Sequence, residues 1–463
     1  MSGPRSLINF CSPLQLKNKA VKKLKNFFLP SRLDNKSDDL PSHLKKIIPL
    51  ASKEFLEWLV GFTDAEGNFS ILPQRNWTSV GLRFTIEVHV DDIDILYKIK
   101  EKLDIGNVVI TKTRSSARFY VEKFEDINSV IIPIFKQYPL QTTKYLDFAN
   151  FLGHAAAFIK LNSSGIYNGR MLNNKFSDTD LLKLKKLKEA MNSGRLIIKS
   201  QEENFLKNKV IINKWWLLGF IEGEGTFGYK HLVPYFQIAQ NQKNLFVLQA
   251  IEEYLINTLK LPKGKEVIKY SLNQGTGVYS MVIYTVDINF HYIVPFFESM
   301  TFFSRKGEDY LYWVIVVIIH KLGYFYLPDG KKIALQISSA TNKFRYTTSL
   351  TKTELPSDES ISKLLAQTPP FDLSSGRSHF ELVREFTIAK GGRKGFSVYI
   401  YELNEQTPSA KYIELKGSPF STYGDGHEAI GLKRGSRVIG RYIDTGKNFK
   451  NKFLFRSIPL DKE

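Results

Sequence analysis

An internal repeat constrains the fold of this 463-residue chain more than any other feature of the sequence. The twelve residues that begin at Trp58 recur 158 residues later at Trp216, with Trp, Leu, Gly, Phe, an acid, a small residue, Glu, Gly and Phe in the same order. Three ordered blocks at similar spacing indicate a tandem duplication of one unit of about 100 residues. The two further blocks recur at offsets of 152 and 162 residues, 84–96 on 236–248 and 133–148 on 295–310.

Each copy predicts the same order of elements, αββαββα, from its periodicity and turn residues. The first helix ends at an acid–glycine step, where Gly67 or Gly225 is expected to take a left-handed cap. The pattern predicts an α+β fold of two pseudo-twofold-related units with antiparallel strands. The expected strand pairs are 69–72 with 82–88, 108–112 with 118–122, 227–230 with 235–240 and 267–272 with 278–284, and the helices that separate them are 93–103 and 245–255.

The rest of the chain divides by composition. Leu181, Leu184 and Leu187 recur at helical spacing among lysines and predict a helix between the copies. A stretch rich in Ser, Thr and Pro predicts a linker after the second copy. The expected organisation is a basic N-terminal extension (1–50), a first repeat (51–152), a helical inter-repeat linker (153–213), a second repeat (214–345), a linker (346–376) and a C-terminal module (377–463).

Small residues four positions apart mark one face of the first helix in each copy. Gly61 with Ala65, and Gly219 with Gly223, would let two helix backbones approach closely. Glycine inside a helix costs up to about 1 kcal/mol relative to alanine, so its use needs a compensating contact. The same face of the other helix is the natural partner. Packing the two helices together would create a pseudo-twofold axis, beside which the C-terminal acids of both helices converge.

Those acids are Glu66 and Glu224. Two carboxylates about 4 Å apart repel each other by roughly 1 kcal/mol in water and about 4 kcal/mol near a protein surface. Both also lie at helix C-termini, where the helix dipole disfavours anions. A hard divalent cation relieves this repulsion, and Mg²⁺ commonly uses one or two carboxylates together with phosphate and water. Paired metals could activate water and stabilise the leaving oxygen of a phosphodiester.

Composition points to a polyanionic partner. Lys and Arg number 65 against 46 Asp and Glu, a formal net charge of +19, which favours nucleic acid or an acidic membrane surface. The single cysteine, Cys11, excludes a disulfide framework and a Cys-based zinc module. No apolar run approaches the roughly 20 residues that span a bilayer. The basic, initially acid-free start of residues 1–50 fits a mitochondrial presequence, a solvated tail or a leader from a fused reading frame.

The repeated motif resembles the signature of the LAGLIDADG homing endonucleases, in the two-repeat single-chain form encoded in organellar introns. The nine-residue signature corresponds to Leu59–Gly67 and Leu217–Gly225, and the resemblance covers about residues 50–345. It implies a saddle of antiparallel sheets on double-stranded DNA and a site-specific double-strand break in a long target. It further implies Mg²⁺ or Mn²⁺ as cofactor, a monomer and a mitochondrial location. The alternative is an RNA maturase that helps its host group I intron to splice.

The resemblance also implies roles for individual residues. Glu66 and Glu224 match the acids that bind the catalytic metals, and Lys144 and Lys306 match the basic residue near the end of each repeat. Gln240 matches the polar residue that closes the second strand. The residue equivalent to Gln240 in the first repeat is Val88, a departure from the pattern that predicts unequal half-sites. Asp64 and Glu222, two positions before the signature glutamates, are interpreted as structural.

A twisted antiparallel sheet can lie along the major groove and present alternate side chains to the base edges. The predicted DNA contacts are Gln74, Arg75, Arg83, Lys112, Arg114, Arg118, Tyr120, Lys230 and Lys269. The C-terminal block begins with an alternating strand at 396–401. Two short helices joined by a glycine-containing turn, and then a basic segment, suggest a helix-turn-helix module that binds nucleic acid. The alternative for this block is a small RNA-binding or structural appendage.

Overall fold

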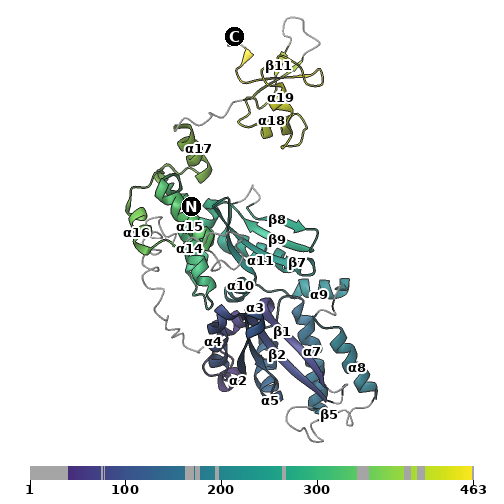
Figure 1. Cartoon of the computed structure of the whole chain (residues 1–463). Helices are drawn as coiled ribbons and strands as arrows, with labels where there is room; N and C mark the ends of the chain where they lie inside the picture. Colours follow the sequence, from purple (N-terminus) through teal and green to yellow (C-terminus); the bar gives the residue numbers. More distant parts are fainter. Residues whose placement is uncertain are drawn as a thin grey trace, which may run out of the picture. The chain divides into compact units, whose positions relative to one another are not determined.

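The computed structural model describes residues 40–74, 77, 79–161, 171–172, 178–192, 195, 198–262, 267–340, 354–389, 398–403 and 412–460. Its contacts divide the chain into two units, residues 1–376 and 377–463 (Figure 1). The first unit contains both sequence repeats.

The first repeat forms an antiparallel sheet in the order β1-β2-β4-β3, in which a short strand, β5 (Met171–Leu172), also pairs with β2. Helix α4 (Ile93–Leu103) packs on one face of this sheet through Leu96, Ile99 and Leu103, which are all buried. The other elements of the repeat are α3 (Lys53–Glu66), β1 (Gly67–Gln74), β2 (Ser79–His89), β3 (Asn107–Thr111), β4 (Ser116–Val121), α5 (Phe124–Asp126), α6 (Ile132–Gln137) and α7 (Lys144–Leu161).

The second repeat has the same topology, β6-β7-β9-β8. The strand register is also the same, since Phe69 pairs with Phe84 in the first sheet and Phe227 with Phe236 in the second. The predicted fold of two pseudo-symmetric α+β units is therefore confirmed. The elements of this repeat are α10 (Lys214–Glu224), β6 (Gly225–Lys230), β7 (Val233–Asn241), α11 (Leu245–Leu259), β8 (Lys269–Asn273), β9 (Val278–Ile283), α12 (Val286–Ile288), α13 (Val294–Glu298) and α14 (Lys306–Lys321).

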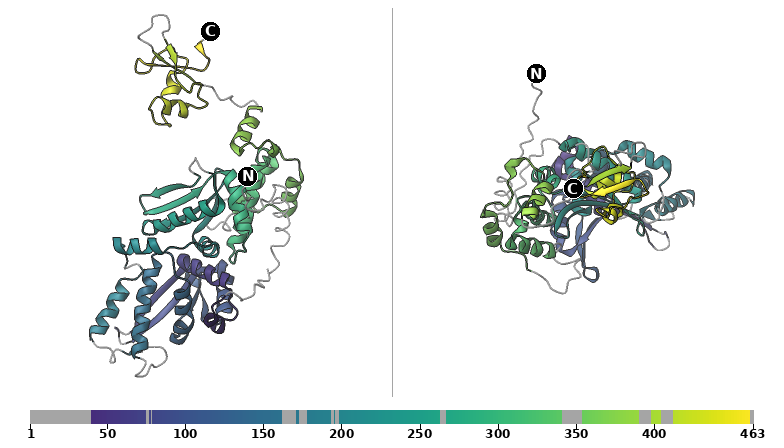
Figure 2. Two further views of the ribbon diagram at one scale, coloured as in Figure 1. Left: turned by 180° about the vertical axis from the view of Figure 1, so that it is seen from behind. Right: turned by 90° about the horizontal axis from the view of Figure 1, so that it is seen from above.

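Helices α3 and α10 lie side by side between the two sheets (Figures 1 and 2). A Cβ atom added at Gly61 would lie 1.9 Å from the carbonyl oxygen of Trp216, and one added at Gly219 would lie 2.1 Å from that of Trp58. One turn further on, a Cβ at Gly223 would lie 2.3 Å from the Cβ of Ala65. The four small residues therefore line the contact between the helices, and the reciprocal pairs reproduce the pseudo-twofold relation.

The expected left-handed caps at Gly67 and Gly225 are wrong. Both residues are extended, with φ of −83° and −78°, and each begins the strand that follows its helix. Glycine is needed there for space. A Cβ at Gly67 would lie 2.7 Å from the carbonyl oxygen of Thr63, and one at Gly225 would lie 2.7 Å from that of Ile221. The close approach lets the chain pass from helix to strand without an intervening loop.

Segments outside the repeats also contribute to the core of the first unit. Leu40, Leu44 and Ile48, around α2 (Ser42–Ile47), are buried against the first repeat. The expected linker 346–376 contains α16 (Asp358–Ala366), whose Ile361 and Leu365 are completely buried. This part of the predicted linker therefore packs as core. The remaining helices of the unit are α8 (Asp178–Glu189), α9 (Ser200–Lys209) and α15 (Pro328–Ala340).

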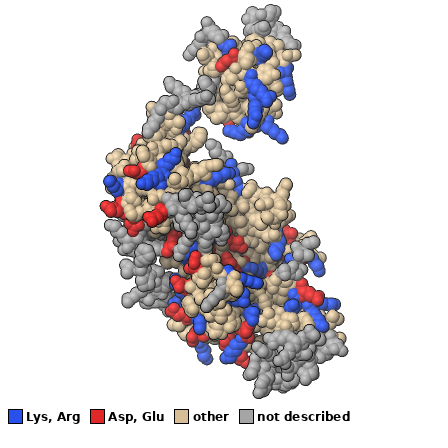
Figure 3. Space-filling model, viewed as in Figure 1, with Lys and Arg blue, Asp and Glu red and all other residues tan. Residues whose placement is uncertain are grey.

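The C-terminal unit is a three-stranded sheet in the order β11-β10-β12 with its own small core. Segment 430–437 joins its two short helices α18 and α19 and is longer than the three- to four-residue turn of a helix-turn-helix. The helix-turn-helix therefore stays a prediction. Lys and Arg gather on the visible face of this unit (Figure 3). Its elements are α17 (His379–Ala389), β10 (Tyr399–Leu403), β11 (Tyr412–Glu414), α18 (Tyr423–Ala429), α19 (Val438–Tyr442) and β12 (Phe453–Arg456).

Among all the helices of the described residues, none is both long and apolar enough to cross a membrane.

Candidate active site

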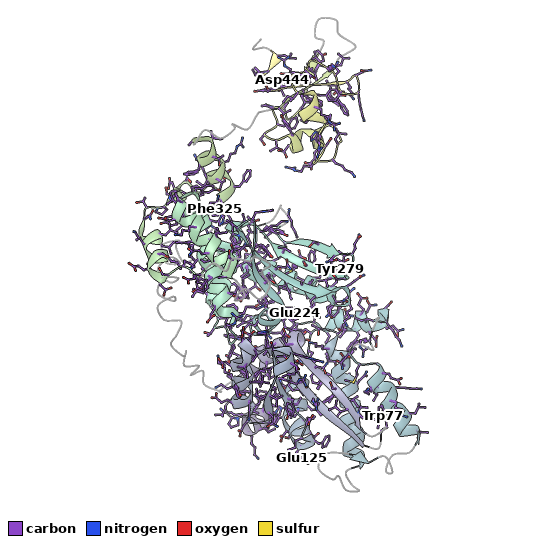
Figure 4. The ribbon with its side chains drawn as sticks, viewed as in Figure 1. Trp77, Glu125, Glu224, Tyr279, Phe325 and Asp444 are labelled. Carbon is purple, nitrogen blue, oxygen red and sulfur yellow. The ribbon has the colours of Figure 1, made fainter. Side chains whose placement is uncertain are left out.

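Glu66 and Glu224 end the two packed helices and line the same cavity, which has a volume of about 600 Å³. Figure 4 labels Glu224 at the junction of the two repeats. The position of a Cβ added at Gly223 lies 3.2 Å from Oε1 of Glu66, so the Glu66 carboxyl group rests against the helix that carries Glu224. The predicted convergence of the two acids is thus present in the fold, and it follows from the close packing of the two helices at their glycines.

Both carboxyl groups are electrostatically strained. Burial raises the pKa of Glu66, while the charges of Lys144 and Lys306 oppose this rise. Burial also raises the pKa of Glu224, and the neighbouring Glu66 charge raises it further. A hydrogen bond from Gln240 partly opposes both effects on Glu224. The site therefore has anionic groups that a cation would stabilise.

The two predicted lysines reach this site from the first residue of α7 and of α14. Lys144 Nζ donates to the carbonyl oxygens of Thr63 (3.1 Å) and Ala65 (2.7 Å) at the end of α3. Lys306 Nζ donates to the carbonyl oxygen of Gly225 (2.6 Å) just beyond α10. A cation at a helix C-terminus is favourable. Burial lowers the pKa of both lysines, and the surrounding carboxylates oppose that shift.

Gln240 connects the second repeat to the loop that precedes Lys144 in the first repeat. It is buried near the end of β7, and its Oε1 accepts a hydrogen bond from Asn244 Nδ2 (2.8 Å). Asn244 Oδ1 in turn accepts from the main-chain N–H of Thr143 (3.0 Å), the residue before Lys144. Sequence reasoning missed Asn244. The signal for it lay in the repeat, because Asn244 aligns with the acid Asp92.

The equivalent flank of the first repeat has different chemistry. Val88 is the equivalent of Gln240 in the first repeat and lines the cavity, but its aliphatic side chain cannot donate a hydrogen bond. Asp92 accepts from Arg305 Nε (3.2 Å) in an ion pair that crosses between the repeats and is largely shielded from solvent. The surroundings of Glu224 thus include the neutral amide of Gln240, whereas those of Glu66 include the charged Asp92 of the ion pair. The unequal half-sites stay a prediction, to which this difference gives a physical basis.

Two of the predicted DNA contacts on the first sheet, Arg83 and Arg118, are held in ion pairs. Arg118 binds Glu87 (2.8 Å) across β4 and β2, and Arg83 binds Glu122. All four residues lie on the sheet face that α4 does not cover, because Phe84, Ile86 and Phe119 alternate with them and face the core. Lys112 and Arg114 lie in a 3₁₀ turn after β3, and Gln74 ends β1. Arg75 lies outside the described residues.

The second sheet presents two exposed lysines, of which Lys230 lies beside an aromatic ring. Lys230 ends β6 and lies 5.8 Å from the ring centroid of Tyr284, which in turn packs on Tyr235. Lys269 begins the edge strand β8 and is exposed. Tyr120 of the first sheet lies 5.8 Å from the guanidinium carbon of Arg83. The two sheets therefore offer different surfaces on their uncovered faces.

Residues 59–154 and 217–317 match the LAGLIDADG endonuclease family. The chain is a two-repeat member of this family. Its relatives include the uncharacterized mitochondrial protein RF1 of Saccharomyces cerevisiae, which is 26% identical over 89% of this chain and 83% of that protein. The probable intron-encoded endonuclease Cox1-I1b of Schizosaccharomyces pombe is 32% identical over 48% of this chain and 56% of that protein.

Solved structures share this fold. The homing endonuclease I-GzeII in complex with its DNA target superposes with a TM-score of 0.52 at 22% identity. I-SmaMI bound to an uncleaved DNA target in the presence of calcium ions gives a TM-score of 0.51 at 20% identity. These matches cover 63% and 62% of this LAGLIDADG chain and 99% of each of those chains.

Proposed function

We propose that this protein is a site-specific DNA endonuclease that cuts both strands of a long target with the help of a divalent metal. One observation carries the proposal: the packing of α3 on α10 brings Glu66 and Glu224 to one cavity, with Lys144 and Lys306 at the same helix ends. The relatives named as intron-encoded endonucleases support it.

The donor set fits Mg²⁺ or Mn²⁺. Within the described part of the chain, no group of three or more His, Cys, Asp or Glu side chains is placed to hold a metal ion. Mg²⁺ does not need such a group, because one or two carboxylates together with phosphate oxygens and water satisfy it. Glu66 and Glu224 would hold the metal, with the scissile phosphates completing the ligands. Bound there, the metal would activate water and stabilise the leaving oxygen of the phosphodiester.

The side chains around the acids would divide the remaining work. The ammonium groups of Lys144 and Lys306 place positive charge near the phosphate, whose oxygens become more negative in the pentacoordinate transition state. This lowers the barrier electrostatically. Gln240 orients Glu224 by its hydrogen bond. Glu66 receives no equivalent bond from Val88, so the two strands would be cut at different rates.

DNA would lie along the uncovered faces of the two sheets. Lys230 and Lys269 of the second sheet would contact phosphates, and Arg83 and Arg118 of the first sheet would approach base edges while still paired with glutamates. The chain contains both half-sites, so it would act as a monomer. A mitochondrial location is supported by the relative in Saccharomyces cerevisiae that is named as mitochondrial.

The proposal is tested with a library of randomised DNA duplexes, which are incubated with the protein and Mg²⁺ before the cleaved ends are sequenced. In a supercoiled plasmid that carries the selected site, Glu66→Gln is expected to abolish double-strand cleavage without changing DNA affinity in fluorescence anisotropy. Glu57→Gln on the same helix, which does not line the cavity, is the control.

Retained double-strand cutting by Glu66→Gln would refute the role of this glutamate. If the wild type cuts no duplex yet binds a group I intron RNA tightly, the nuclease proposal fails and the maturase alternative takes its place.

A further inference from the structure

A buried carboxylate in the first repeat connects the contact between α3 and α10 to the loop that precedes Lys144. Asp64 on α3 is only 3% exposed. Its Oδ2 accepts a hydrogen bond from the indole Nε1–H of Trp216 on α10 (2.8 Å) and another from the main-chain N–H of Gln141 (2.8 Å). Its Oδ1 accepts from both the main-chain N–H (3.1 Å) and the hydroxyl of Thr142 (2.6 Å). One side chain thus binds the other repeat and its own loop.

The second repeat has the same arrangement with a glutamate. Glu222 on α10 is 5% exposed, and its Oε1 accepts from the indole Nε1–H of Trp58 on α3 (3.0 Å). The main-chain N–H groups of Phe303 (2.9 Å) and Ser304 (2.6 Å) supply the remaining bonds. These donors are the repeat equivalents of those around Asp64, although the glutamate is one methylene longer. The indoles are exchanged, since each repeat sends its tryptophan to the acid of the other.

In each repeat the hydroxyl residue that binds the carboxylate also binds the lysine that begins the next helix. The Thr142 hydroxyl oxygen accepts the main-chain N–H of Lys144 (3.2 Å), and the Ser304 hydroxyl oxygen accepts that of Lys306 (3.3 Å). The Lys144 ammonium group then returns to the carbonyl oxygens on either side of Asp64. Asp64 therefore sits between the backbone and the head group of Lys144, whereas the Lys306 ammonium group donates to the carbonyl oxygens on either side of Glu224.

Every partner of these carboxylates is a donor. A buried carboxylate is costly unless its oxygens are saturated by hydrogen bonds, and here the indole from the other repeat completes the set. If α3 and α10 separated, each acid would lose that indole and gain water, and the loop before the lysine would lose its fixed anchor. The place of each lysine is therefore coupled to the docking of the repeats.

We propose that Asp64 and Glu222 are positioning residues. Each fixes the lysine of its own repeat through the hydrogen bonds that its carboxylate accepts, here called the clamp, which the tryptophan of the other repeat completes. This inference rests on the proposed nuclease function for its effect on cleavage. The clamp itself is a property of the fold. It lets each half of the site become competent only when both repeats are docked.

The first test follows the two strands of a supercoiled plasmid with the selected target. Asp64→Asn replaces one acceptor oxygen by a donor that faces only other donors. Misplacement by about 1 Å can slow catalysis about 100-fold, so the rate for one strand is expected to fall by that order while DNA affinity stays unchanged. Nicked plasmid should accumulate. Glu222→Gln should produce nicks on the opposite strand.

Two further variants separate positioning from stability. Trp216→Phe removes the indole N–H but keeps an aromatic ring, and it should slow the same strand as Asp64→Asn. Asp64→Glu copies the second repeat and should restore more double-strand cutting than Asp64→Asn. Trp313→Phe is the matched control, because it removes another buried indole hydrogen bond, to the carbonyl oxygen of Tyr235 (3.0 Å), and should cause no strand bias.

A second readout does not depend on activity. Hydrogen exchange of the peptide 141–146 should accelerate in both Asp64→Asn and Trp216→Phe, while that of 303–308 stays closer to wild type. The proposal is overturned if Trp216→Phe leaves exchange at 141–146 unchanged, or if all variants slow both strands equally. A wild type that cuts no DNA but shows the expected exchange would reject the nuclease function and leave the clamp standing.

Discussion

Gly61 and Gly219 make the candidate active site possible because a side chain at either position would keep the two helices apart. Each glycine lies so close to a carbonyl oxygen of the other helix that an added Cβ atom would overlap with that oxygen. The distance between Glu66 and Glu224 is therefore set more than one turn away, by main-chain contact between the helices.

Gly219→Ala is expected to destabilise the protein by about 1–3 kcal/mol, because the new methyl group meets backbone that cannot rotate away. Chemical denaturation of the full chain measures the change. Gly153→Ala is the matched control, since that helical glycine faces the flexible end of Leu187 at 3.2 Å and alanine favours helix. Equal stability of the two variants would contradict the proposed role of the helix contact.

Gln240 gives a second prediction for a single residue. Wild type is expected to cut one strand before the other, and Gln240→Val, which copies Val88, should reduce that difference by slowing the faster strand. The variant removes a hydrogen bond to Glu224 and leaves the Asn244 amide without its acceptor. Time courses of nicked and linear plasmid measure both steps. Val88→Ala changes volume alone and should leave the order of cutting unaltered. Unchanged kinetics in Gln240→Val would contradict the asymmetry.

The sequence predicts those site residues that lie in a motif present in both repeats. Glu66 and Glu224 stood out because the same motif occurs twice. Asn244 did not, because its partner Thr143 lies 101 residues away, and only the fold brings the two together. Asp64 and Glu222 were predicted as structural, but the exchange of indoles between repeats leaves no pattern along the chain. The caps at Gly67 and Gly225 were mispredicted because close approach and positive φ both select glycine.

The two sheets differ as elements. The first has its arginines paired with Glu87 and Glu122, which limits the positive charge available to phosphates. The second presents Lys230 and Lys269 at its exposed strand ends. The second sheet is therefore expected to supply more of the electrostatic affinity and the first more of the base discrimination.

Lys230→Gln and Lys269→Gln are each expected to lower the slope of log affinity against log salt by about 0.9, which is the effect of losing one phosphate contact. Fluorescence anisotropy with the selected duplex at several salt concentrations measures the slope. Lys100→Gln, on α4 behind the first sheet, should leave it unchanged. A slope that is insensitive to both substitutions would show that these lysines do not contact phosphate.

Element boundaries followed the strength of the local signal. Helix α4 was predicted at its observed bounds because apolar residues recur regularly along it. The predicted strands β1 and β2 are too short, since the pairing continues into residues such as Asn68, Pro73 and Gly81, which show no alternating pattern. Helix α16 was placed in a linker because Ser and Pro flank it. Its buried leucines are recognisable as core only from their packing with the rest of the first unit.

At the scale of the whole molecule, the C-terminal unit adds a separate basic surface. Residues 377–463 contain 16 Lys and Arg against 10 Asp and Glu, and exposed examples include Arg437 and Arg441 around α19. We propose that this unit also binds nucleic acid.

Deletion of 377–463 is expected to weaken binding to the selected duplex and to reduce its salt dependence, while residues 1–376 keep Mg²⁺-dependent cleavage at high protein concentration. Anisotropy and plasmid cleavage measure the two properties. A truncated protein with the affinity and slope of the full chain would show that the C-terminal unit has another role.

The burial of Leu40, Leu44 and Ile48 limits how the protein could mature after synthesis. If an organellar protease trims the basic leader, it has to stop before Leu40. Removal of the following residues would uncover the apolar base of the first repeat and lower the yield of folded enzyme.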